Sequence, residues 1–199
     1  MDHHDIPDFI ISEEQGAILV RLARHTIARR LDSTVEPVED EELARLLSDD
    51  IFRQPRATFV TLHKSGALRG CMGTLSPGES LIDSIRHNAV NAAFHDPRFP
   101  PLTADELAQV QIEVSILTIP QPLPHATGDE LLAALRPGID GVILQFGAAG
   151  ATFLPQVWEQ LPRPEDFLSR LCLKAGLPAD TWQTGRLDVQ TYQVRHFSE

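Results

Sequence analysis

Apolar residues recur with the period of an α-helix in several stretches of the chain. The pattern predicts helices over residues 12–31, 40–47, 80–95 and 164–176, and a short helix that opens at a Thr127-x-x-Glu130 cap. The first of these begins with a Ser-x-x-Gln capping box, in which side chains and backbone N–H groups satisfy each other. Its apolar stripe is formed by Ile18, Leu19, Leu22, Ala23 and Ile27.

A two-residue period marks the strands. It is strictest over residues 110–118, where apolar side chains occupy every second position from Val110 to Ile116. Lys64-Ser65-Gly66 separates two further strands, and Gly66 can take the positive φ that a tight hairpin needs. Hairpins mixed with helices, without regular βα alternation, predict an α+β fold with antiparallel sheet flanked by helices. The predicted strands cover residues 57–63, 67–75, 110–118, 142–146, 151–154 and 187–197.

The register of the first hairpin has two alternatives. A loop of Ser65-Gly66 alone places Val60 opposite Cys71, whereas a loop that also includes Lys64 places Phe59 there. Either alternative puts Cys71 in the second strand of an antiparallel pair.

Composition narrows the class of protein. A chain of 199 residues, 42% apolar, suits one domain, which we expect over residues 10–199, with a smaller lobe within it and a mobile N-terminus over residues 1–9. The 17 Lys and Arg against 28 Asp and Glu give 17 − 28 = −11, which disfavours nucleic-acid binding. No apolar run approaches the roughly 20 residues of a membrane helix. Two cysteines are no disulfide framework, so we expect a cytoplasmic protein with reduced thiols.

The segment Leu68-Arg69-Gly70-Cys71-Met72-Gly73 is the strongest candidate for chemistry. In a regular strand Arg69 and Cys71 leave the same face, and a guanidinium beside the sulfur favours thiolate. That pair suits a nucleophilic step or a small anionic ligand. Gly70 and Gly73 are expected to expose the sulfur and nearby backbone N–H groups, although glycine in a strand also marks a bulge or a close backbone approach. The alternative is a cysteine that is simply buried.

The helix predicted over residues 80–95 carries a second polar signal. Solvated helix faces are usually rich in Lys, Glu and Arg, so an arc of amides and imidazoles favours the lining of a polar cleft. A plain wet surface is the alternative. We predict that Asn88, Asn91 and His95 face the same cavity as Arg69 and Cys71. The full arc consists of Ser84, His87, Asn88, Asn91 and His95.

The segment Asp96-Pro97-Arg98-Phe99 ends this helix, because a proline cannot continue it. We interpret the segment as a structural corner, in which Asp96 bonds the backbone and Arg98 reaches either Asp96 or the helix-end carbonyls. The corner would aim the polar arc of the helix.

Glu113 and Ser115 share one face of the strand over residues 110–118. Glu113 can pair with Arg69 or Arg98, or act as an acid or base, and pairing is the favoured interpretation. The chain has no CxxC, no HExxH and no carboxylate cluster at ligand spacing, so no metal site is predicted and no cofactor is indicated.

Taken together, these motifs resemble the AMMECR domain family, named for a candidate protein of the AMME-syndrome chromosomal region. Its bacterial and archaeal members are called AmmeMemoRadiSam system protein A. The similarity runs from about residue 10 to the end, and its most specific element is the Leu68 to Gly73 segment, where Met72 replaces the family's usual isoleucine. The other matches are Asp96-Pro97-Arg98-Phe99, Ile112-Glu113-Val114-Ser115, Phe153-Leu154-Pro155-Gln156-Val157 and Lys174-Ala175-Gly176-Leu177.

The resemblance implies two unequal lobes with a cleft between them, and association with a Memo-type protein and a radical SAM enzyme. It favours a functional Cys71 and adds Gln156 as a candidate ligand contact. The family brings no settled reaction, so three functions compete. The first is an enzyme, or the catalytic accessory of a radical SAM system, that uses Cys71. The second is an adaptor whose cleft binds a partner segment, and the third, disfavoured by the charge, is a nucleic-acid modification factor.

Overall fold

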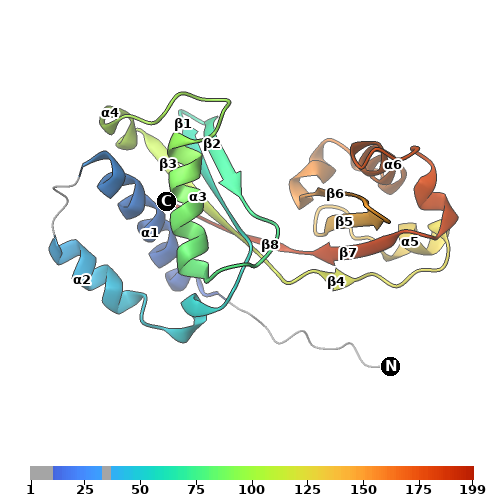
Figure 1. Cartoon of the computed structure of the whole chain (residues 1–199), viewed down its shortest axis with the longest axis horizontal. Coiled ribbons are helices and arrows are strands. Elements are labelled where there is room, and N and C mark those ends of the chain that lie inside the picture. Colours follow the sequence, from blue (N-terminus) through green and yellow to red (C-terminus); the bar gives the residue numbers. More distant parts are fainter. Residues whose placement is uncertain (1–10, 33–36) are drawn as a thin grey trace. The chain divides into compact units, whose positions relative to one another are not determined.

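The computed structural model describes residues 11–32 and 37–199, and within them the chain forms two compact units (Figure 1). The first unit contains the described residues up to Leu117 together with Arg195–Glu199, and the second is Thr118–Val194. The second unit is therefore one continuous segment inserted into the first. Each unit has its own hydrophobic core. The predicted mobile N-terminus over residues 1–9 lies outside the described residues.

The first unit is an antiparallel sheet with helices on one face (Figure 1). The strand order is β2-β1-β3-β8, and α1 and α3 pack against the sheet and each other. This unit contains α1 (Glu13–Leu31), α2 (Pro37–Leu46), the 3-10 turn η1 (Asp50–Arg53), β1 (Thr58–Lys64), β2 (Ala67–Gly73), α3 (Leu81–Phe94), α4 (Ala104–Leu107), β3 (Val110–Leu117) and β8 (Val194–Ser198).

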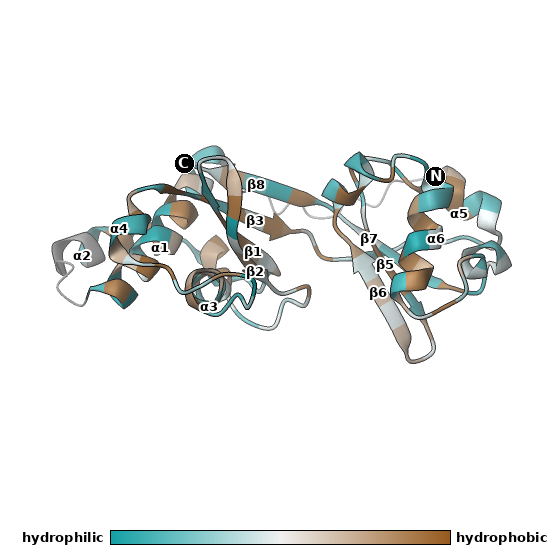
Figure 2. Cartoon of the chain, turned by 90° about the horizontal axis from the view of Figure 1, so that it is seen from above, coloured by the Kyte–Doolittle hydropathy of each residue, from teal (hydrophilic) through white to brown (hydrophobic). Residues whose placement is uncertain are grey.

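The core of the first unit lies between the sheet and these helices. Alternate residues of β1 and β3 point into it, as the two-residue period predicts, and the buried stripes of α1 and α3 meet them. In Figure 2 α1 carries both teal and brown residues, as an amphipathic helix should. The fully buried members include Leu19, Ile27, Val60, Leu62, Ile85, Ala89, Ile112 and Val114.

The helices predicted in this unit are confirmed, and the capping residues explain where α1 and α3 begin. Ser12 and Gln15 form the predicted capping box of α1. Ser80 caps α3 by accepting the Asp83 N–H at 3.2 Å, and His95 follows its last residue. The helix predicted over residues 40–47 begins earlier, at Pro37.

The first hairpin pairs antiparallel as predicted, but in a register that neither alternative anticipated. Lys64 pairs with Ala67, so the loop is Ser65-Gly66, and both loop residues have positive φ, at 53° and 79°. Beyond the turn the register shifts by one residue, and Thr61 lies opposite Cys71. The shift is a β-bulge in β2.

The second unit has its own antiparallel sheet, in the order β4-β7-β5-β6, with α6 packed beside β6 (Figure 2). In its core the Trp158 and Phe167 rings stack at 3.7 Å, and the Trp158 indole N–H donates to the Asp140 carbonyl at 2.7 Å. This unit contains β4 (Gln121–Pro122), α5 (Gly128–Ala134), β5 (Gly141–Phe146), β6 (Ala149–Phe153), η2 (Pro155–Glu159), α6 (Pro164–Lys174), η3 (Thr181–Thr184) and β7 (Asp188–Tyr192).

The strand predicted over residues 187–197 is two strands in two sheets. β7 ends at Tyr192 in the second sheet, and β8 starts at Val194 in the first. Gln193 separates them and bonds Thr118, which lies where the chain enters the second unit. Among the helices of the described residues, none has the length and apolar character that crossing a membrane would require.

Candidate functional site

The bulge in β2 separates the two residues that the sequence placed together. Leu62 pairs with Gly70 and His63 with Leu68, so Arg69 is the inserted residue of the strand. A bulge breaks the rule that residues two apart share a face. Arg69 joins Glu106 on the helix-covered side and is 8% exposed, whereas Cys71 contacts Thr61 on the other face. The expectation that Arg69 and Cys71 share a face is therefore corrected.

Arg69 belongs to a partly buried ion cluster with Glu106 and Lys64. Its Nε and one terminal nitrogen donate to the Glu106 carboxylate at 3.2 and 2.9 Å, and Lys64 Nζ donates to the same group at 3.0 Å. The guanidinium also lies 6.0 Å from the centre of the Phe99 ring. Arg69 thus already has a carboxylate partner, and its role as an anion ligand stays a prediction.

This ion cluster predicts acid-sensitive stability. Hydrogen bonds from Arg69 and then Lys64 lower the pKa of Glu106 from 4.5 to about 2. Because the pKa of Glu106 is lower in the folded protein than in the unfolded chain, the ionised carboxylate stabilises the fold at pH values above about 4.5. This contribution is lost as the pH falls from about 4.5 towards 2. We expect Glu106→Gln to flatten the pH dependence of the urea midpoint in that window. The control Asp105→Asn, in the neighbouring exposed carboxyl, should keep the wild-type slope, and an equal slope in both variants would contradict the assignment.

A polar row crosses the face of the first sheet that is turned away from α1 and α3. Thr61 pairs with Cys71 on one side and with Glu113 on the other, and each alternates with core residues of its strand. Thr61 Oγ1 donates to Cys71 Sγ at 3.3 Å. His196 of β8 extends the row, with its Nδ1 3.3 Å from Glu113 Oε1. We call Cys71, Thr61, Glu113 and His196 the outer row.

Glu113 pairs with a histidine and not with the arginines that the sequence favoured. The contact with His196 is the main cause that lowers the pKa of the Glu113 carboxyl, and the nearby His63 adds to it. Ser115 shares the same face, as predicted, and its hydroxyl lies 3.0 Å from His196 Nδ1. Glu113, His196 and Ser115 therefore form one hydrogen-bonded network beside Thr61.

The two glycines beside Cys71 are explained by close packing. A Cβ on Gly70 would lie 2.2 Å from the Ala92 carbonyl oxygen of α3, so the strand meets the helix backbone there. A Cβ on Gly73 would overlap the Phe59 ring at 2.3 Å. The structure thus gives both glycines a packing reason, and their role as ligand contacts stays a prediction.

Side chains of the Asp96–Phe99 corner form hydrogen bonds with the backbone of Cys71. Asp96 accepts the Cys71 N–H at 2.9 Å, and Arg98 donates to the Cys71 carbonyl at 3.2 Å. The two side chains also bond each other, at 2.9 and 2.7 Å. These contacts depress the pKa of Asp96 strongly, with the Arg98 hydrogen bonds as the largest cause. Since β2 is an edge strand, the corner takes the place of a further strand at Cys71.

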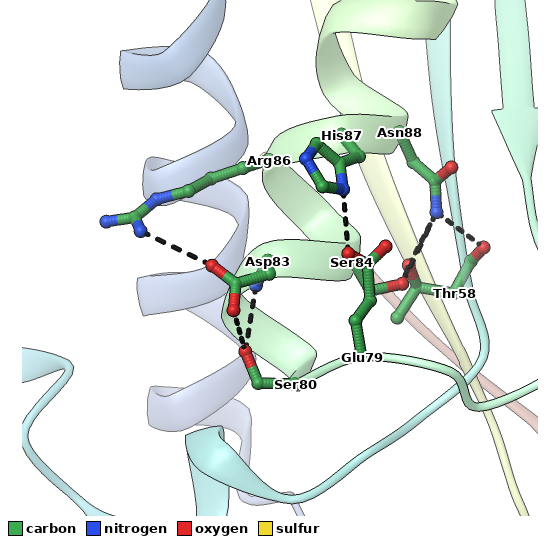
Figure 3. Close-up of polar contacts among 8 residues, drawn as sticks. All are labelled: Thr58, Glu79, Ser80, Asp83, Ser84, Arg86, His87 and Asn88. Atoms are coloured by element: carbon green, nitrogen blue, oxygen red, sulfur yellow. Dashed lines mark hydrogen bonds and ion pairs between the residues drawn. The ribbon is translucent and has the colours of Figure 1, made fainter.

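Two members of the polar arc of α3, Asn88 and Ser84, face Thr58 of β1. Figure 3 shows Asn88 pointing at Thr58, where its amide donates to the Thr58 carbonyl at 3.0 Å and hydroxyl at 2.9 Å. Ser84 bonds the same hydroxyl at 2.7 Å. Thr58 belongs to the alternate set of β1 residues that points towards the helices. Asn88 is therefore buried against the sheet and does not line the predicted shared cavity.

The other predicted site residues are dispersed. Asn91 is half-buried on α3 and lies 3.1 Å from the ring nitrogen of His95, which is exposed at the end of the helix. Gln156 is exposed in η2 of the second unit. The structure brings Cys71, Glu113 and Ser115 to one face and places Arg69 and Asn88 on the helix-covered side of the sheet. That Asn91 and His95 share a cavity with Cys71 stays a prediction.

Sequence reasoning missed Thr61, His63 and His196. Thr61 and His63 alternate with Val60 and Leu62, so their shared face was readable once the strand was recognised. His196 was not readable, because the predicted strand over residues 187–197 did not reveal that its last part joins another sheet. No group of three or more His, Cys, Asp or Glu in the described ranges is placed to hold a metal ion.

Comparison with known proteins identifies the family to which a chain with this fold belongs. The crystal structure of an uncharacterized protein, PH0010 from Pyrococcus horikoshii, superposes with a TM-score of 0.77 at 33% identity, covering 95% of this chain and 93% of that one. A Methanothermobacter thermautotrophicus protein is 38% identical over 95% of this chain and 96% of its own length. A Thermofilum pendens protein is 39% identical over 95% and 92%.

The family model described as AMMECR1 matches residues 20–197, which includes the whole outer row. The chain belongs to the AMMECR1 family. The predicted resemblance and the α+β fold with antiparallel sheets are thus confirmed.

Proposed function

We propose that the outer row is the working surface of this AMMECR1-family protein and that Cys71 is its reactive group. The observation that carries the proposal is the position of the thiol: it is free, half-buried and bonded by Thr61, on the sheet face turned away from α1 and α3. The second cysteine, Cys172, is fully buried in α6. The protein then acts as an enzyme or as a catalytic accessory.

The spacing of the row limits the chemistry. Cys71 and Glu113 flank Thr61 on neighbouring strands, so about 10 Å separates their backbones. Direct proton transfer between the thiol and the carboxylate is therefore not favoured in this arrangement. A substrate lying across Thr61 would meet the thiol at one end and the Glu113–His196 pair at the other. A role for the pair as acid or base is part of the proposal.

Thiol labelling tests the proposal with an internal control. We expect iodoacetamide near neutral pH to modify Cys71 rapidly and Cys172 only after unfolding, because burial raises the pKa of the Cys172 thiol. The measurement is a time course of peptide mass spectra. Equal protection of both cysteines in the native protein would reject Cys71 as the reactive group.

Replacement of Cys71 separates function from stability. We expect Cys71→Ser to change the free energy of unfolding by less than about 1 kcal/mol, because a serine hydroxyl also accepts from Thr61 and the site is half-buried. Function in a complementation assay should be lost. A strongly destabilised serine variant that keeps wild-type function would assign Cys71 to packing.

A second candidate function is an adaptor that binds a partner segment along the same row. The observation that favours it is the absence of a preformed base next to the thiol within the described residues of the row. The Cys71→Ser variant distinguishes the two functions, because an adaptor should tolerate this substitution. An adaptor should instead lose its partner when Thr61 is replaced by a bulky residue.

We also propose a Memo-type protein and a radical SAM enzyme as partners, and the cytoplasm as the compartment. Family membership supports the two partners, and the two free cysteines support the cytoplasm as the compartment. Copurification of the tagged full chain with the two candidate partners, from cells that express all three, tests the partnership. Elution of the chain alone would count against it.

A further inference from the structure

We propose that Asp96 and Arg98 are positioning residues that set the reactivity of the Cys71 thiol through opposite and balanced charges. This inference rests on the proposed function of Cys71. It assigns to Arg98 the role that the sequence suggested for Arg69, whose guanidinium is taken up by Glu106 on the helix-covered side. Arg98 instead contacts the main chain of Cys71 directly.

The contacts at Cys71 come from two charged side chains that also hold each other. Asp96 Oδ2 accepts the Cys71 N–H and an Arg98 N–H, at 2.9 and 2.7 Å. Arg98 donates to the carbonyl of the same cysteine at 3.2 Å. The Asp96 side chain is 2% exposed and that of Arg98 is 54% exposed. One carboxylate and one guanidinium thus lie on the two backbone groups of the residue that carries the thiol.

A neighbouring cation favours thiolate and a neighbouring anion disfavours it. Because the two charges are close and opposite, their effects on the thiol oppose each other in the intact pair. Removal of either charge leaves the other unbalanced next to Cys71. The two single variants should therefore shift the alkylation profile in opposite directions, whereas a purely structural corner would disturb Cys71 in the same direction in both.

The experiment is the pH–rate profile of iodoacetamide alkylation of Cys71 in the full chain, followed by peptide mass spectra. We expect Arg98→Met to move the profile to higher pH and to slow labelling at pH 7 by about threefold. Asp96→Asn should move it to lower pH and speed labelling at pH 7 by about threefold. The position of the profile is read as well as the rate, since a more acidic thiol is also a weaker nucleophile.

Controls separate charge from geometry. The double variant Asp96→Asn with Arg98→Met should return to within about twofold of wild type, and so should Arg98→Lys, which keeps the charge. Arg86→Met removes an arginine of similar exposure, 51%, from the α3 surface and should leave the profile unchanged. The other titratable groups of this face, His63, Glu113 and His196, are the same in every variant.

Each outcome decides one proposal. Opposite shifts support the charge-balanced pair; shifts in the same direction, or no shift, overturn it. Where Asp96→Asn does not fold, Arg98→Met against Arg98→Lys still decides, because only the methionine variant should shift. If Cys71 of the wild type labels no faster than Cys172, the proposed function fails before the variants are compared.

Discussion

Gly70→Ala is expected to lower the free energy of unfolding by about 3 kcal/mol, at the upper end for overpacked sites. The added Cβ would lie 2.2 Å from the Ala92 carbonyl oxygen, a backbone atom that cannot rotate away. Either β2 or α3 must move, and β2 carries Cys71. Urea unfolding measures the change.

The chain offers a matched control at Gly78. A Cβ there meets nothing within 4 Å, so Gly78→Ala should stay within about 0.5 kcal/mol of wild type. A Gly70→Ala variant as stable as the Gly78→Ala variant would mean that the strand and helix do not approach as closely as described. It would also return Gly70 to the group of candidate ligand contacts.

Asn88→Ala is expected to cost about 2–3 kcal/mol, because it removes a buried amide that bonds both the carbonyl and the hydroxyl of Thr58. The substitution also leaves a cavity between α3 and β1. Differential scanning calorimetry or urea unfolding measures the loss.

Asn91→Ala is the matched control, one turn along the same helix and half-buried. It should cost less than about 1 kcal/mol. If Asn88 instead contacted a ligand in a cleft, Asn88→Ala would leave stability unchanged and impair function. That result would restore the prediction from the amide and imidazole arc.

The periodic pattern of apolar residues predicted the helices and strands well, because burial of one face of each element produces that pattern. α1, α3 and β3 follow from apolar stripes and from side-chain caps, both local in sequence. The division at Gln193 did not follow, since both halves of the segment alternate in the same way. Which sheet each half joins depends on residues far away in the chain.

The candidate site was predicted in part. Cys71, Glu113 and Ser115 share a face, as strand geometry implies for each of them in its own strand. The prediction that Arg69 and Cys71 share a face was wrong because one inserted residue reverses the alternation of side chains, although Gly70 beside Arg69 is a recognised sign of a bulge. The prediction for Asn88 was wrong because an amide suits a buried hydrogen-bonded contact as well as a wet cleft. Composition does not distinguish the two.

The insertion of the second unit has a consequence for the order of synthesis. The first sheet receives β8 only from the last residues of the chain, after all of Thr118–Val194 has been made. The second unit can fold as soon as it emerges, because its core contains no later residues. The first must wait with β3 unpaired on one edge, and Glu113 meets His196 last of all. A chain that has emerged from the ribosome only as far as Tyr192 would therefore hold every strand of the second sheet and an incomplete outer row.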